Sequence, residues 1–195
     1  MLKSVYDLLG KNYFIPSYQR GYRWGKRQVQ DLLEDLYAFT TDIKKSPGAF
    51  YCLQPIVVKV CDSQTVTNNN LHSELDNNTW YEVIDGQQRL TTLYILFKNL
   101  MQEFGKDISR MGAQLFKIEY QTNSNTNNPL DTPEMPDSSS ANAYNITDTY
   151  KNISEWFQSL PETKNIPQVD LVADTFWNLL NNTKELSKFP TYAQL

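Results

Sequence analysis

The sequence predicts an α/β (α+β) fold in which short strands alternate with amphipathic helices. The clearest sign is a strand, a turn and a helix in succession around Gly86. Residues 80–84 (Trp-Tyr-Glu-Val-Ile) are rich in the aromatic and β-branched side chains that strands favour. Gly86 ends this pattern, and from Leu90 to Phe104 the apolar residues recur at helical spacing. Elements of both kinds occur before and after this unit, which predicts a compact α/β arrangement.

The remaining elements follow from the same periodicities. Helices are predicted at residues 2–9, 28–43, 146–160 and 169–180, and strands at residues 50–60 and 115–120. The helix at 28–43 is stopped by the Ser-Pro-Gly of residues 46–48, and Pro55 places a break or an edge within the strand at 50–60.

Three segments predict loops. Residues 13–24 are expected to be extended, because Pro16 cannot lie inside a helix and restricts the residue before it. The polar, Asn-rich residues 62–79 predict a long exposed loop. Residues 121–140 have few apolar side chains and three prolines, which predicts a surface excursion outside the core. We therefore expect a domain at 1–120, a polar loop at 121–140 and a helical region at 141–195 whose abrupt end predicts a truncated fragment.

Composition and charge exclude several classes of protein. Forty per cent of the 195 residues are hydrophobic, which is typical of a globular chain. No apolar run approaches the length of a membrane span and the N-terminus is not a signal peptide, so we expect a cytoplasmic protein. The net charge is −4, but residues 1–45 carry eight Lys/Arg against five Asp/Glu, a net +3. Nucleic acid, if bound, should therefore touch the N-terminal part first.

Cysteine and histidine are too scarce for a disulfide framework or a zinc site. Cys52 and Cys61 lie in or beside one predicted strand, and His72 is the one histidine. Both cysteines are expected to be reduced residues of the core or a sheet edge, which suits the cytoplasm. His72 with Glu74 and Asp76 in a polar loop makes a poor metal site.

The turn at residues 85–89 (Asp-Gly-Gln-Gln-Arg) has two interpretations. A helix that begins here presents unpaired N–H groups and the positive end of its dipole, which suits a phosphate. Gly86 would permit close backbone approach, and the Arg89 guanidinium can grip two phosphate oxygens. The alternative is a structural turn in which Asp85 caps the helix and pairs with Arg89. The local pattern does not separate the two.

The extended segment at residues 13–24 interleaves arginines with aromatic residues. Such a pattern can stack on bases and pair with phosphates, and the possible DNA or base contacts are Tyr18, Tyr22, Arg23 and Trp24. The alternative is that the aromatic residues fix the loop on the core and leave the arginines in water.

Three segments together resemble a known family. They are Ile15-Pro-Ser-Tyr-Gln-Arg-Gly-Tyr-Arg-Trp24, Pro55-Ile-Val-Val58 and Tyr81-Glu-Val-Ile-Asp-Gly-Gln-Gln-Arg-Leu-Thr-Thr92. In order and spacing they are similar to the N-terminal domain of the GmrSD-type modification-dependent restriction enzymes, whose hallmark is the Asp-Gly-Gln-Gln-Arg motif. The layout more distantly resembles the ParB/sulfiredoxin-like fold. Family members often carry an arginine just after the third strand, where this chain has Gln121.

The resemblance implies a nucleotide (NTP) as ligand, hydrolysis of that NTP, Mg²⁺ or another divalent cation, and DNA, possibly modified. It also implies a nuclease domain or subunit that one histidine in this chain cannot supply. The rival hypothesis is a ParB-like nucleotide-gated DNA-binding module without turnover, and a third possibility is a scaffold that binds nothing alone.

Together, the resemblance and the physical pattern give each site residue a role. The phosphate contacts are expected from Gly86, Arg89, Thr91 and Thr92, with Gln19 and Arg20 closing the site. Because the two polar clusters bracket the same strand–helix layout, we predict that the loop at residues 18–24 packs near residues 85–89. Arg89 would stabilise charge during phosphoryl transfer, and Gln87 or Gln88 would orient a water. Asp85 would hold the cation or cap the helix.

Overall fold

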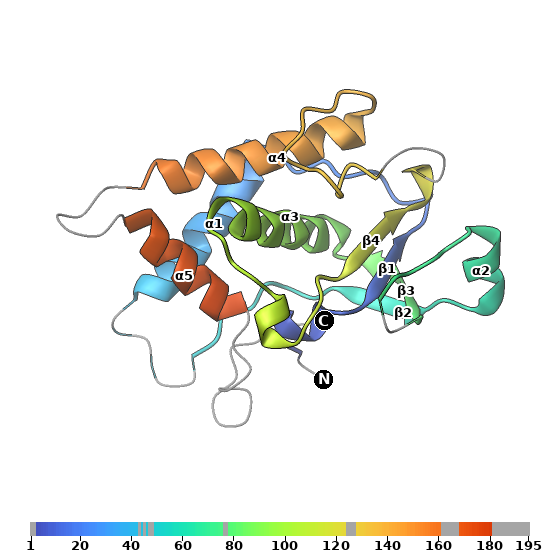
Figure 1. The fold of residues 1–195 in the computed structure, drawn as a ribbon, viewed down its shortest axis with the longest axis horizontal. Helices are drawn as coiled ribbons and strands as arrows, with labels where there is room; N and C mark the ends of the chain where they lie inside the picture. The colour runs from blue at the N-terminus through green and yellow to red at the C-terminus, as the bar shows by residue number, and fades with distance from the viewer. Residues whose placement is uncertain are drawn as a thin grey trace.

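A mixed sheet lies at one end of the molecule (Figure 1). The computed structural model describes residues 3–42, 44, 46, 49–75, 78–123, 128–160 and 168–180. Within these residues the sheet has four strands in the order β2-β3-β1-β4, namely β1 (Asn12–Ile15), β2 (Val57–Val60), β3 (Trp80–Asp85) and β4 (Lys117–Tyr120). β1 pairs in parallel with β3 and β4, whereas β2 is antiparallel to β3. The predicted α/β (α+β) class is confirmed; the likeness to ParB/sulfiredoxin-like folds stays a prediction.

Helices cover the two faces of the sheet unequally. The large helices α1 (Lys26–Thr41), α3 (Gln87–Glu103), α4 (Ala141–Gln158) and α5 (Gln168–Leu180) lie on one side, and the short α2 (Ser63–Asn68) lies on the other (Figure 1). Three 3₁₀ turns complete the described elements, at Val5–Leu8, Ser109–Met111 and Gln121–Asn123. Strand residues alternate between the faces. Tyr13 and Ile15 therefore join the large core beneath α3, while Phe14 joins a small cluster with Leu71 and Trp80.

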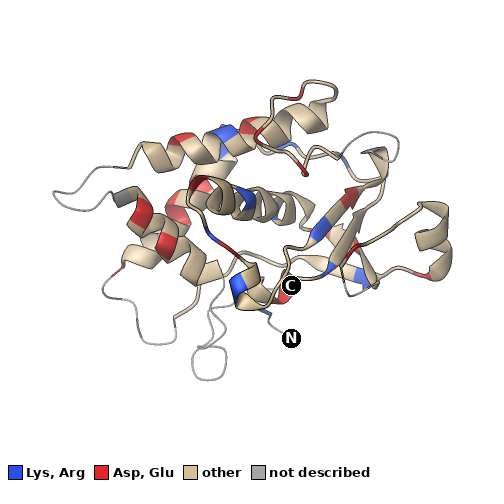
Figure 2. Cartoon of the chain, in the orientation of Figure 1, with Lys and Arg blue, Asp and Glu red and all other residues tan. Residues whose placement is uncertain are grey.

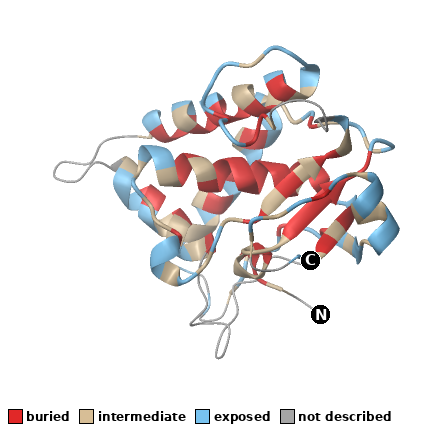
Figure 3. Cartoon of the chain, turned by 45° about the vertical axis from the view of Figure 1, so that its right-hand side comes forward, coloured by how far each residue is buried: buried red, intermediate tan, exposed pale blue. Residues whose placement is uncertain are grey.

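The helix α3 is the centre of the large core. It contacts both α4 and α5, and its residues are buried on almost every side (Figure 3). It begins after Gly86, which has the left-handed φ of +87°, and ends at Glu103, followed by the C-cap Phe104 and by Gly105 with a φ of +60°. Because the C-terminal ends of the parallel strands β1, β3 and β4 lie at one edge of the sheet, the start of α3 and the loop after β1 meet there.

Several predicted boundaries were wrong for local reasons. Asn12–Ile15 is a central strand and not part of a loop, since its backbone pairs with β3 and β4, which lie far away in the sequence, and its side chains are buried. The strand predicted at 50–60 begins only at Val57, because Gln54 has a φ of +67° and Pro55 lacks an N–H. The predicted loop at 62–79 contains α2, whose N-cap Asp62 accepts a hydrogen bond from the N–H of Thr65 at 2.7 Å.

The helices α4 and α5 confirm the two predicted C-terminal helices, and both belong to the same core cluster as the first 120 residues. The expected boundary at residue 120 therefore does not divide the hydrophobic core. The described residues of the segment 121–140 are mostly exposed, but Leu130 is fully buried in that core, which corrects the prediction that the whole segment lies outside it. The parts of the sequence predictions that concern residues 2, 43, 45, 47–48, 76–77, 124–127, 161–167 and 181–195 lie outside the described residues. Of the described helices, none is long and apolar enough to span a membrane.

Candidate functional site

The loop after β1 is tied to the start of α3 by side-chain amides. The Gln19 amide donates hydrogen bonds to the carbonyls of Val83 and Ile84, the latter at 3.2 Å, and so holds the loop against the end of β3. The Gln87 amide donates to the carbonyl of Arg20. The prediction that residues 18–24 pack beside residues 85–89 is therefore confirmed.

The Gln88 side chain also ties the loop after β1 to the start of α3. Its Oε1 accepts hydrogen bonds from the N–H groups of Arg23 at 2.8 Å and Trp24 at 3.2 Å, and its Nε2 donates to the carbonyl of Gly21 at 3.2 Å. Both ends of the amide are satisfied by the loop backbone. This corrects the expectation that Gln88 orients a water as an acceptor, because its Oε1 already accepts two hydrogen bonds from the loop and only one N–H of its Nε2 is left.

Tyr22 is a core residue. Its side chain is fully buried, and its hydroxyl shares a hydrogen bond of 2.8 Å with Thr92 and accepts one of 3.1 Å from Thr149. Burial raises its pKa to about 12. Its backbone N–H and C=O are bound by Asn142 and Asn145 of α4, at 2.7 and 2.9 Å. The prediction that Tyr22 contacts DNA or a base is therefore wrong. Tyr22 instead fixes the loop on the core, as the alternative interpretation proposed.

The two threonines after the motif also face inward. The hydroxyls of Thr91 and Tyr120 lie 2.7 Å apart, and Thr92 donates to the carbonyl of Gln88 in addition to its contact with Tyr22. Both threonines are essentially unexposed. The prediction that they contact phosphate is wrong, because the residues five and six positions after Gly86 lie on the core side of the first turns of α3.

Gly86 is required by packing. A Cβ at this position would lie 2.9 Å from both the Cα of Ile56 and the carbonyl oxygen of Pro55. The sequence suggested that Gly86 permits close approach of the backbone to a ligand. The atoms that approach it closely belong to Pro55 and Ile56, just before β2. No side chain caps α3 at Gly86, and the first hydrogen bond within the helix runs from the N–H of Leu90 to the Gly86 carbonyl. The preceding N–H groups, at Gln87, Gln88 and Arg89, have no partner within the helix.

Arg89 is held by the chain before β2. Its Nη2 donates to the carbonyl of Pro55 at 2.7 Å, and its Nη1 donates to Oε1 of Gln54 at 3.2 Å. The Asp85 carboxylate lies 3.8 Å from Nη2, as the structural alternative predicts, but Asp85 does not cap the helix. The Arg89 Nε is buried and has no hydrogen-bond partner within the described residues.

These elements enclose a pocket of about 310 Å³, near the lower end of the range for ligand sites. It is lined by Gln19, Arg20, Trp24 and residues 85–89. The exposed Arg20 guanidinium makes no hydrogen bond or ion pair with the described part of the chain, and the buried Gln87 Oε1 also has no partner there. Figure 2 shows basic and acidic residues interspersed over the molecule. Within the pocket lining, two arginines stand against the one carboxylate of Asp85, and the start of α3 adds the positive end of the helix dipole.

The remaining loop residues are placed at the surface. Tyr18 is 69% exposed and donates a hydrogen bond of 2.7 Å to Glu82, Arg23 is exposed, and Trp24 is partly buried against the core. These three stay candidates for contact with DNA.

A protein-built metal site is absent from the described residues, in which no three His, Cys, Asp or Glu side chains cluster. Asp85 is the single carboxylate in the pocket lining, and 70% of its side chain is exposed. Both cysteines are free. Cys61 directly follows the edge strand β2 and is partly buried, whereas Cys52 is exposed and lies outside the strands, so the expectation of a core or sheet-edge residue is wrong for Cys52. A divalent cation would therefore depend on Asp85 together with oxygens of a bound ligand, which is an arrangement Mg²⁺ commonly adopts with phosphates.

The fold and the pocket define a small mixed α/β domain with an arginine-containing polar site at the start of its central helix. The family model for the N-terminal domain of the GmrSD restriction endonuclease matches residues 2–192, so the chain belongs to this family and is a domain of a restriction or phage-defence system. The comparison with curated proteins gives no match.

Proposed function

We propose that this chain is the nucleotide-binding domain of its restriction system, and that the pocket at the start of α3 holds the phosphates of an NTP. The observation that carries the proposal is the convergence of uncapped helix N–H groups and the unpaired Arg20 guanidinium on one pocket. Each is a group that binds anions: no side chain caps the helix N–H groups, and Arg20 forms no ion pair with the described chain, whereas the Asp85 carboxylate in the same lining pairs with Arg89.

Arg20 and Arg89 take different parts in this proposal. Arg20 is the phosphate ligand, because its side chain is free to turn toward the pocket. Arg89 is a positioning residue: its two Nη atoms are bound to Gln54 and Pro55, and its Nε is the nitrogen that has no partner within the described residues. This differs from the sequence-based expectation, in which Arg89 grips phosphate through both ends of its fork.

Asp85 fits a role in holding Mg²⁺. An exposed carboxylate beside a phosphate site is unfavourable unless a cation lies between the two groups of like charge. Asp85 would hold Mg²⁺ together with the bound nucleotide, and the ion would supply positive charge against the phosphates.

Binding is better supported than hydrolysis. Gln88 is used by the loop backbone, which leaves Gln87 Oε1 and Asp85 as the groups in the pocket able to orient a water. Turnover stays the second candidate function because Gln87 Oε1 is a buried acceptor without a partner in the described chain. A water held by this oxygen would satisfy it and would lie in the pocket.

The site is suited to coupling nucleotide to DNA. Gln87 and Gln88 lie at the start of α3 and hold the backbone of residues 20–24, so a phosphate bound to their N–H groups would act on the loop that carries Arg23 and Tyr18. We propose that this loop contacts DNA, and that a nuclease domain outside this chain performs the cleavage.

The test is a titration of ATP, GTP, CTP and UTP with Mg²⁺ into the wild type and the Arg20→Ala variant. We expect at least one NTP to bind the wild type and to bind the variant more weakly. Arg27→Ala is the matched control, because Arg27 is 90% exposed on α1 and does not line the pocket. Phosphate release, measured with and without DNA, then separates turnover from binding alone. Absence of binding for all four nucleotides would refute the proposal.

A further inference from the structure

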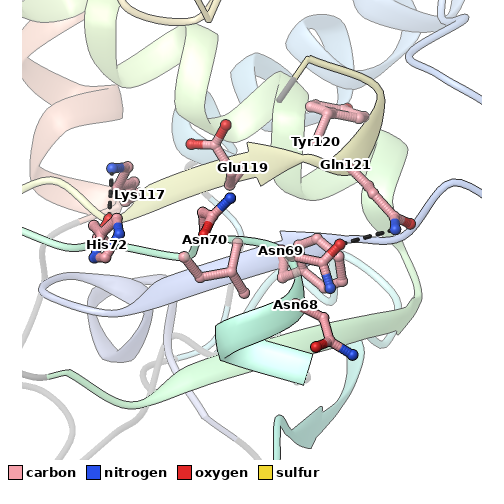
Figure 4. A pocket seen from close by; sticks show the side chains of 10 residues that line it. Asn68, Asn69, Asn70, His72, Lys117, Glu119, Tyr120 and Gln121 are labelled. Atoms are coloured by element: carbon pink, nitrogen blue, oxygen red, sulfur yellow. Dashed lines mark hydrogen bonds between the residues drawn. The ribbon is translucent and has the colours of Figure 1, made fainter. Parts of the chain in front are cut away.

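A second pocket, of about 370 Å³, lies on the face of the sheet opposite α3, between β4 and the chain that follows α2 (Figure 4). Alternation along β4 explains its chemistry. Ile118 and Tyr120 enter the large core, so the side chains of Lys117 and Glu119 project from the other face. Phe14 and Leu71, both buried in the small cluster, supply apolar lining.

The carboxylate of Glu119 is the unsatisfied group of this pocket. It is about half-buried, and it makes no hydrogen bond or ion pair with the described residues. Burial raises the pKa of the Glu119 carboxyl. The neighbouring Lys117 ammonium is engaged elsewhere, because it donates to the carbonyl of His72 at 2.8 Å and lies 5.8 Å from the centre of the Trp80 ring. A ligand that donates hydrogen bonds would satisfy Glu119.

Side-chain amides flank this carboxylate. Figure 4 shows Lys117 and His72 at one end of the pocket, Asn69 and Gln121 at the other, and Asn70 with Glu119 between them. Gln121 donates to Oδ1 of Asn69 at 2.8 Å and accepts from the N–H of Ser17 at 2.7 Å, so this end is fixed. Asn70 follows α2 with a φ of +48°, and its side-chain amide makes no hydrogen bond within the described chain.

We propose that this second pocket binds a guanine base. Guanine carries two adjacent N–H donors on its Watson–Crick edge, at N1 and N2, and a carboxylate can accept both. The amides of Asn70 and its neighbours can donate to the ring acceptors. The charge of Glu119 disfavours an anionic ligand, and the charge of Lys117 disfavours a cationic one, so a neutral base fits better than either. Among the bases, adenine offers a carboxylate no pair of adjacent donors.

The source of the guanine is a free nucleotide or an unpaired base of a nucleic acid strand. Both present the same edge, and the experiment distinguishes them. The proposal does not depend on phosphate binding at the start of α3, because the ligand used to test it is the nucleoside without phosphates.

The experiment is calorimetric titration of the full chain with guanosine, inosine and adenosine. Inosine lacks the N2 amino group and so removes one of the two donors. Guanosine should bind most tightly, inosine more weakly and adenosine weakest, with guanosine and adenosine differing by roughly five- to a hundred-fold. Glu119→Gln should weaken guanosine binding by a similar factor, since the amide replaces one of the two acceptor oxygens of the carboxylate with an NH₂ donor that faces a guanine donor.

The matched control is Glu82→Gln. Phe14 of β1 pairs with Glu82 on one side and Glu119 on the other, so both acids occupy the same face of the sheet. Glu82 is bound to Lys59 at 3.1 Å and Tyr18 at 2.7 Å and does not line the pocket, so its variant should bind guanosine as the wild type does. Asn70→Gly removes an amide while a glycine keeps the left-handed backbone, and this variant should bind more weakly.

A single-stranded oligonucleotide with one guanine identifies the source. Tighter binding of the oligonucleotide than of guanosine assigns the pocket to a strand, and tighter binding of guanosine assigns it to a free nucleotide. The proposal is overturned if guanosine binds no better than adenosine, or if a folded Glu119→Gln variant keeps the wild-type affinity.

Discussion

The Arg20→Ala substitution separates ligand binding from folding. Arg20 is exposed and its guanidinium makes no hydrogen bond or ion pair with the described residues, so its loss should change the free energy of unfolding by less than about 0.5 kcal/mol. A charge-assisted hydrogen bond to a phosphate contributes about 1.5–3 kcal/mol. Nucleotide affinity should therefore fall roughly ten- to a hundred-fold while the melting temperature stays within about 2 °C of the wild type.

Arg89→Ala, in contrast to Arg20→Ala, should act mainly on folding stability. Its bonds to the Pro55 carbonyl at 2.7 Å and to Gln54 at 3.2 Å hold the chain before β2, whereas the exposed pair with Asp85 at 3.8 Å contributes little. Losing the bonds to Pro55 and Gln54 should lower the free energy of unfolding by about 2 kcal/mol. For a domain of this size that corresponds to a fall of roughly 4–8 °C in melting temperature.

Differential scanning calorimetry of both apo variants and calorimetric NTP titration measure the two effects. The assignment of Arg20 as the phosphate ligand fails if Arg20→Ala binds NTP as tightly as the wild type. The assignment of Arg89 as a positioning residue fails if Arg89→Ala melts with the wild type and yet loses nucleotide affinity.

Three further variants test the surroundings of the two pockets. Gly86→Ala should destabilise the fold by at least about 1–3 kcal/mol in urea unfolding, because its φ is +87° and its Cβ would lie 2.9 Å from the Pro55 oxygen; wild-type stability would contradict this. Tyr22→Phe removes a buried hydroxyl from Thr92 and should cost about 1–2 kcal/mol by the same assay, and an unchanged midpoint would show that the hydroxyl contributes nothing. Because burial raises the pKa of Glu119, its ionisation opposes folding, and the opposition appears as pH rises through that raised pKa. Glu119→Gln should thus melt at or above the wild type at neutral pH, with the difference vanishing below the ordinary value of 4.5; a gain that persists in acid would refute this origin.

The sequence predicted those elements of the fold whose pattern is local. The strand β3, the turn at Gly86 and the helix α3 follow from a change of period within residues 80–104. The strand β1 escaped prediction because Pro16 directly follows it and favoured a loop, and because its pairing depends on β3 and β4 far along the chain. The helix α2 has six residues and little apolar periodicity, so its N-cap at Asp62 was its main signal.

The sequence predicted the place of the candidate site better than the roles within it. The meeting of Arg20 with the Asp-Gly-Gln-Gln-Arg turn was predicted from the two polar clusters and is observed. That Gln88 binds the loop backbone and that Arg89 binds Pro55 depends on tertiary contacts that residue type does not encode. Nothing in the sequence marked Asn142 and Asn145 as partners of Tyr22, since they lie about 120 residues away on α4.

The central claim is that phosphates of an NTP bind the start of α3, and backbone amide NMR during titration with Mg²⁺ and an NTP tests it most directly. The account predicts that the amide resonances of Gln87, Gln88 and Arg89 shift saturably with the nucleotide, together with those of the loop at Arg20. The same shifts should be weakened in Arg20→Ala and preserved in Arg27→Ala. Saturable nucleotide binding that leaves residues 86–89 unshifted would contradict the account.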